Sequence, residues 1–336
     1  MTIQPRFLIR RIAILSVLLL LLLAAVMILG ISTGSSGSNL ASLYQLCMNW
    51  EDADPVLKAI VWRIRLPRVL LAVQAGAALS LGGLVFQAIL RNPLAEPYIL
   101  GISGGSAVGA ILGILAGMAY FPGVGLMAFA GSIITLLIIF FISMGQTTVK
   151  KDSLLLSGVM VNAFCSSVIM FFISMTHDSR LQNILFWIMG DFSLADMQQV
   201  LVLFVFLVPC FLLIFWLSHT MNLLLMGKEM ALTMGVNVKM ITIALLLTTS
   251  FMVSAIVAYS GLVGFVGLVI PHLLRLLFGS DHRLLVPACI LGGGTYMVLC
   301  DLLARSLPEQ GEMPIGVITA FIGAPLFIFL LRKTRQ

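Results

Sequence analysis

Four arginines could form ion pairs with carboxylates. Arg63, Arg65 and Arg68 lie close together, and Arg305 follows Asp301 by four residues. A guanidinium group makes two parallel hydrogen bonds with a carboxylate, so it suits recognition of Glu or Asp. Three interpretations stay open: pairing of Arg305 with Asp301 on one helix face, anchoring to lipid headgroups, or docking of an acidic protein on Arg65, Arg68 and Arg305.

Residue patterns typical of metal or nucleotide chemistry do not occur. The five cysteines are scattered without a Cys-x-x-Cys pair, and the four histidines lack metal-ligand spacing. No phosphate-binding loop of the Gly-x-x-x-x-Gly-Lys-Ser/Thr type is found, so the chain is not expected to hydrolyse ATP. We predict no metal site, no cofactor bound by this chain and no catalytic residues.

The composition is that of a membrane protein. Of the 336 residues, 60% are hydrophobic and only 10% are charged, and the mean hydropathy is +1.13. A helix needs about 20 mostly apolar residues to cross a bilayer. We therefore expect an all-α, polytopic membrane protein that forms a single transmembrane domain over 1–336. Ten segments are predicted to span the membrane: 12–31, 69–90, 99–118, 125–144, 154–175, 200–217, 241–259, 262–278, 284–303 and 315–331.

The distribution of basic residues predicts the orientation of these spans. An even number of spans places both termini on one side, and thirteen of the 19 Lys and Arg residues fall on that side. The positive-inside rule makes this side cytoplasmic. The first span is longer than the apolar region of a signal peptide, so we expect it to remain uncleaved. The net charge of +6 is explained by residues that flank spans, and no nucleic-acid partner is expected.

A cytoplasmic insert at 219–239 separates the sixth and seventh spans. Gly227 and Gly235 each follow a short run of residues, which predicts two short helices broken by glycines. The insert is partly apolar, so it is expected to lie on headgroups or to enter a groove of another protein. The residues of interest are Gly227, Lys228, Glu229, Met230, Ala231, Leu232, Met234 and Gly235.

Glycines recur every four residues after the polar segment 91–97. They occupy positions 101, 105, 109, 113 and 117. This spacing keeps them on one stripe of a helix, where the absence of side chains lets another helix approach closely. We expect close helix packing along this stripe.

Several ordered motifs resemble one family of transport proteins. The sequences RLPR at 65–68, NPLAEP at 92–97 and GFVGLVIPH at 264–272 occur in this order. With them the chain resembles the FecCD family of ABC importer permeases over essentially its whole length. Further matches are Ser157-Gly158 with Asn162, Trp187 with Gly190, Asp281-His282-Arg283, and Pro314-Ile315-Gly316 with Gly323-Ala324-Pro325.

The resemblance implies a fold, an assembly and roles for residues. It implies a type II ABC importer permease in the cell inner membrane, with a homodimer of ten-helix subunits that enclose the pathway. Two ABC ATPase subunits that use ATP and Mg would bind below, and a periplasmic binding protein above. Arg65, Arg68 and Arg305 match positions that dock glutamates of the binding protein, and 227–238 matches the coupling helices that enter the ATPase. Gly82, Gly83, Phe86, Gly101, Gly105 and Gly109 are expected either near the path or in helix packing within one subunit.

The cargo is not determined by these residues. From how commonly the family carries each metal chelate, a ferric siderophore is the first expectation and cobalamin the second, with haem or molybdate as further alternatives. A hypothesis of another class is an energy-independent channel or a membrane scaffold that shares the fold.

Overall fold

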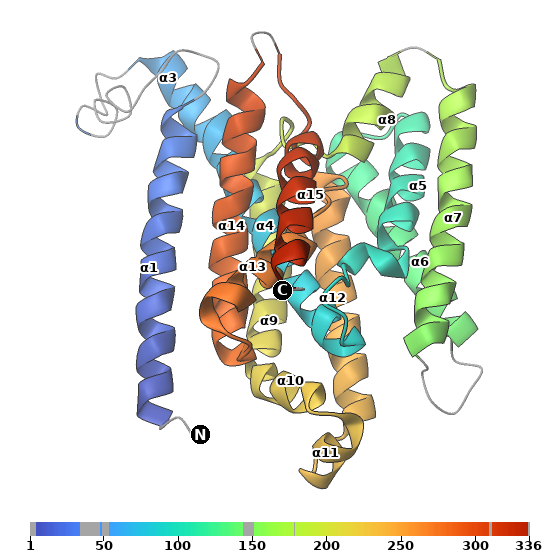
Figure 1. Cartoon of the computed structure of the whole chain (residues 1–336). Helices are drawn as coiled ribbons and strands as arrows, with labels where there is room; N and C mark the ends of the chain where they lie inside the picture. Colours follow the sequence, from blue (N-terminus) through green and yellow to red (C-terminus); the bar gives the residue numbers. More distant parts are fainter. Residues whose placement is uncertain are drawn as a thin grey trace.

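The chain folds into a bundle of helices (Figure 1). The computed structural model describes residues 5–33, 48, 54–143, 151–177, 179–308 and 311–334. Every regular element within these ranges is a helix, and they contain no strand. The predicted all-α class is therefore confirmed.

Each of the ten predicted spans coincides with an apolar helix of the described chain. In three of these helices the apolar part is shorter than a full span: α5 (Ile102–Leu115), α13 (Val266–Phe278) and α15 (Ile315–Thr334). The other seven are long and apolar enough to cross a membrane. They are α1 (Pro5–Ser32), α4 (Leu66–Leu90), α6 (Gly125–Ser143), α7 (Lys151–Met175), α9 (Met197–Trp216), α12 (Val238–Ser260) and α14 (His282–Ser306).

The eighth predicted span begins later than expected. Gly261 and Phe265 have φ angles of 66° and 68°, and the residues between them are not helical. Because a left-handed backbone cannot continue an α-helix, α13 starts only at Val266. The third span is shortened in the same way, since Gly101 with φ 67° precedes the start of α5.

Shorter helices connect the spans. Two of them, α10 (Ser218–Leu225) and α11 (Lys228–Thr233), lie at the same end of the bundle as the start of α1, here called the α11 end (Figure 1). The opposite end carries α3 and is called the α3 end. The remaining connectors are α3 (Pro55–Ala59), the π-helix η1 (Ile60–Arg65), the 3₁₀-helix η2 (Pro97–Leu100), the π-helix η3 (Tyr120–Val124) and α8 (Ser179–Met189).

Helix α4 forms the centre of the subunit. In its most apolar window 83% of the residues are buried, against 11% for α1, which lies at the edge of the bundle (Figure 1). Glycines let α14 approach α4 closely: a Cβ atom on Gly76 would overlap the carbonyl oxygen of Gly293, and one on Gly293 would overlap that of Gly76. Gly83 on α4 meets Gly267 on α13 in the same manner.

Replacing Gly293 by alanine is expected to destabilise the fold by about 1 to 3 kcal/mol, because neither backbone can yield to the added methyl group. Gly292→Ala is the matched control on the same helix. A Cβ there meets only the side chain of Leu274 at 3.4 Å, so this variant should be neutral or more stable by up to about 1 kcal/mol. Reversible unfolding in mixed micelles measures both. Equal stability of the two variants would contradict the packing described here.

Candidate functional site

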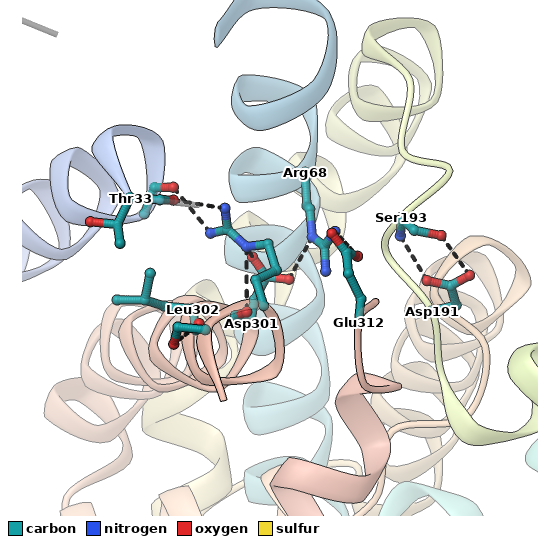
Figure 2. Close-up of polar contacts among 10 residues, drawn as sticks. Thr33, Arg68, Asp191, Ser193, Asp301, Leu302 and Glu312 are labelled. Atoms are coloured by element: carbon teal, nitrogen blue, oxygen red, sulfur yellow. Dashed lines mark hydrogen bonds and ion pairs between the residues drawn. The ribbon is translucent and has the colours of Figure 1, made fainter. Parts of the chain in front are cut away.

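Asp301 is the centre of a buried ion cluster at the α3 end. Arg68 Nε donates to Asp301 Oδ1 at 2.7 Å, and Arg305 Nε lies 3.0 Å from Asp301 Oδ2. Arg68 also uses Nη1, which donates to Glu312 Oε2 at 2.5 Å. Figure 2 shows Arg68 between the two carboxylates, one from α14 and one from the loop before α15. Of the three interpretations that the sequence left open, the pairing of Arg305 with Asp301 is found in the structure.

Two of the arginines also cap the end of α1. Arg65 Nη1 donates to the carbonyl groups of Ile31 and Ser32, both at 2.9 Å, and Arg305 Nη2 donates to that of Gly30 at 3.0 Å. Helix ends leave such carbonyl groups without a partner in the helix, and their partial negative charge attracts cations. The cluster thus joins α1, the start of α4 and the end of α14.

These contacts determine where the three predicted docking arginines lie. Arg65, Arg68 and Arg305 are only 4%, 4% and 5% exposed. In the subunit they bind groups of their own chain and do not project from the surface. Contact with another protein stays a prediction, and Glu312, with a side chain 34% exposed, is the most accessible member of the cluster's ion pairs.

The insert at 219–239 contains the two short helices that its glycines predicted. Helix α10 ends at Leu225 and α11 starts at Lys228, and Gly227 between them has φ 122°. Gly235, with φ 78°, follows α11. A Cβ atom on Gly227 would meet no other atom within 4 Å, so the joint between the two helices is unobstructed.

Helix α11 presents apolar side chains to the outside of the subunit. Met230, Leu232 and Met234 are 48%, 51% and 58% exposed, whereas Ala231 is fully buried. Glu229 is exposed in the first turn, where a negative charge favours the helix. A small apolar surface with one acidic residue, carried on a projecting helix, suits insertion into a groove of a partner.

Sequence reasoning did not find the contacts that hold α10. Asn222 bonds to Asp281 and His282, which precede and begin α14. Only Asp281 carried a usable signal, because Asp before a helical pattern is a preferred N-cap and it accepts from the backbone of Arg283 at 3.0 Å. Burial opposes ionisation of Asp281, but hydrogen bonds from Arg283 and Asn222 outweigh it and lower its pKa to about 2. Asp281 is therefore an anion throughout the physiological pH range.

The residues predicted near a path or in helix packing lie inside the subunit. Phe86 is fully buried, and a Cβ on Gly82 would meet Val253 at 2.9 Å. Gly105 and Gly109 pack their backbone against α6, where a Cβ atom would overlap groups of that helix. Gly83 packs on α13 as described above, and Gly101 lies at the start of α5. These contacts are helix packing, and a place beside a path stays a prediction.

No metal centre is found in the described ranges. They contain no group of three or more His, Cys, Asp or Glu residues that could hold a metal ion. Cys165, Cys210, Cys289 and Cys300 are buried free thiols, and Cys47 lies outside the described residues.

A family model for the FecCD transport family matches residues 19–333, which is nearly the whole chain. The chain belongs to the FecCD transport family. This FecCD chain is 39% identical over 305 residues to the vitamin B12 import system permease protein BtuC of Salmonella typhi, covering 88% of this chain and 93% of that relative. It is 41% identical over 278 residues to BtuC of Citrobacter koseri, covering 82% and 84%.

Solved structures agree with this assignment. A chain of a metal-chelate type ABC transporter in an inward-facing conformation superimposes on the FecCD chain with a TM-score of 0.84 and 34% identity, covering 95% of this chain and 98% of that one. PsaBC from Streptococcus pneumoniae, at 15% identity and a TM-score of 0.57, shares the fold and covers 86% and 94%. The FecCD chain is therefore a multi-pass ABC importer permease and has the fold of the metal-chelate transporters.

Proposed function

We propose that the chain is the permease subunit of an importer that moves cobalamin (vitamin B12) into the cell. The observation that carries this proposal is the 39% identity to BtuC over 93% of its length, since closely related permeases commonly share a cargo. A ferric siderophore, the first expectation from the sequence, becomes the second candidate. The solved transporter is of the metal-chelate type, and both cobalamin and a ferric siderophore are metal chelates.

The assembly proposed for this function follows from the two ends of the bundle. The α11 end faces the cytoplasm, and α11 with its exposed Met230, Leu232 and Met234 enters one of two ABC ATPase subunits. Two copies of the chain enclose the path in the inner membrane, and both termini are cytoplasmic. A binding protein delivers the chelate at the α3 end. No covalent chemistry and no bound cofactor is required of this chain; ATP and Mg are used by the ATPases.

Alternating access supplies the mechanism. ATP binding brings the two ATPases together and displaces the two α11 helices. Because α4 meets α14 at Gly76 and α13 at Gly83 through direct backbone contacts, such a displacement moves each subunit as a body and exposes the path first to one side and then to the other. The chain forms a path that is accessible from one side of the membrane at a time, and ATP use by its partners supplies the energy.

Cargo can be tested with the complete complex in proteoliposomes. With ATP inside and the binding protein outside, labelled cobalamin should accumulate, and a tenfold excess of unlabelled cobalamin should suppress the label. A tenfold excess of a ferric hydroxamate should leave it unchanged. Accumulation of the labelled ferric chelate in place of cobalamin would contradict the cobalamin assignment and favour the siderophore.

Docking of an acidic binding protein at the ion cluster gives a separate prediction. The five charged side chains of the cluster comprise three cations and two anions, so the cluster keeps a net positive charge that attracts carboxylates. Arg65→Gln should weaken binding about tenfold and make it less sensitive to salt. Arg180→Gln is the control, because Arg180 is exposed on α8 away from the cluster. Surface plasmon resonance measures the affinity of each variant for the binding protein. Equal affinities of Arg65→Gln and Arg180→Gln would exclude the docking role.

A further inference from the structure

The side-chain amide of Asn222 joins α10 to the start of α14. Its Nδ2 donates to Asp281 Oδ1 at 2.8 Å, and its Oδ1 accepts from the backbone N–H of His282 at 2.9 Å. The ring Nδ1 of His282 lies 2.7 Å from the same oxygen. Donor and acceptor are thus both used, and one of the bonds goes to an anion, which makes it stronger than a neutral one.

A second bond ties α10 to α4. Arg91, which ends α4 with φ 50°, donates from Nη2 to the carbonyl oxygen of Leu224 at 2.7 Å. The apolar face of α10 is seated as well, since Met221 and Leu224 are 0% and 3% exposed. Helix α10 is therefore attached to both α4 and α14 at the α11 end of the bundle.

Helices α4 and α14 form one body between the two ends of the subunit. Near their middle Gly76 and Gly293 bring the two backbones together, and at the α3 end Arg68 bonds to Asp301 at 2.7 Å. Packed elements with few alternative arrangements move as units. A displacement of α10 at one end must accordingly move the ion cluster at the other.

The connection between α10 and α11 is short. Met226 and Gly227 separate the two helices, and the positive φ of Gly227 is one that few other residues adopt. Helix α11 is thus joined to α10 by a two-residue connection, whereas α10 is bonded to both α4 and α14. A force from α11 that passes this joint meets two attachments of α10, the bond of Leu224 to Arg91 on α4 and the bonds of Asn222 to Asp281 and His282 at α14.

We propose that Asn222 is a positioning residue that transmits the displacement of α11 to the α4–α14 pair by holding Asp281 and His282. The inference rests on the proposed function, because it concerns how ATP use by the partner drives this chain. Without the Asn222 bonds α10 slips against α14, and ATP is hydrolysed while fewer chelates are carried.

An exchange of the two polar side chains tests this role. Asn222→Asp places a second carboxylate against Asp281 and should lower the number of chelates carried per ATP about tenfold, with assembly and ATP hydrolysis retained. Asp281→Asn should have a smaller effect, because an amide at 281 can still accept from Asn222. In the double variant, the carboxylate at 222 can accept from His282 and from the new amide, so coupling should return toward the wild-type value.

Hydrogen exchange gives a readout that does not depend on transport. The amide of His282 should exchange about tenfold faster in Asn222→Asp and should be protected again in the double variant. Unchanged coupling in Asn222→Asp, or no recovery in the double variant, would overturn the inference while wild-type accumulation still supports the proposed function. A wild-type complex that accumulates nothing with ATP would overturn the proposed function, and the inference with it.

Discussion

Asp301→Ala is expected to destabilise the folded chain by about 3 to 5 kcal/mol, because it removes the carboxylate shared by two buried arginines. Asp301 is fully buried, and Arg68 and Arg305 would keep their charge without it. Two like charges would then face each other in a region of low dielectric constant. The ends of α4 and α14 should separate, and the cap on α1 that Arg305 contributes should loosen with them.

Glu312→Ala serves as the control for this prediction. Glu312 also pairs with Arg68, but its side chain is 34% exposed, so water can replace it and the cost should be about 1 kcal/mol or less. Unfolding by denaturant in detergent, followed by tryptophan fluorescence, measures both variants. An Asp301→Ala protein as stable as Glu312→Ala would show that the ion cluster does not hold these helices together.

Replacing residues 228–234 by a Gly/Ser linker of equal length is expected to reduce uptake to the level seen without ATP. The linker keeps the chain connected but removes α11 and its exposed Met230, Leu232 and Met234. A flexible segment cannot transmit a displacement, so hydrolysis by the ATPases should no longer be coupled to transport. The dimer should persist, because the linker leaves all the membrane-spanning helices unchanged.

The control for the linker variant lies at the other end of the subunit. Leu307→Ala alters a residue that is 61% exposed after α14, and uptake should remain at the wild-type level. Uptake and ATP hydrolysis are measured on the same proteoliposomes. Normal uptake with the linker in place would reject the coupling role of α11.

The positions of the spans could be predicted because hydropathy is a property of sequence alone. All ten predicted spans coincide with apolar helices, and the glycines at 227 and 235 indicated the two short helices at the α11 end. Helix α8 was not predicted as a helix, since its 11 residues are too short for a span. The late start of α13 depends on the left-handed conformation of Phe265, a residue with no intrinsic preference for it.

The contacts of the candidate site were harder to predict because they join distant parts of the chain. Arg68 and Asp301 are 233 residues apart, and Asn222 and Asp281 are 59 apart. Sequence reasoning identified the arginines by their type and left open ion pairing with Asp301, headgroup anchoring and protein docking. Folding buries Arg65, Arg68 and Arg305 against Asp301 and carbonyl groups of α1. The order of the cargo candidates also changed, because it rested on the family as a whole and the relatives reported above are vitamin B12 permeases.

We expect this chain to provide a path that opens only when partner ATPases drive it. The most direct measurement compares cobalamin flux in proteoliposomes that contain the chain alone with flux in those that also contain its ATPase and binding protein. We predict accumulation against a gradient only in the complete system with ATP, and none with an ATPase variant that binds ATP but cannot hydrolyse it. Passive equilibration of cobalamin through the chain alone would contradict the account and identify the protein as a channel.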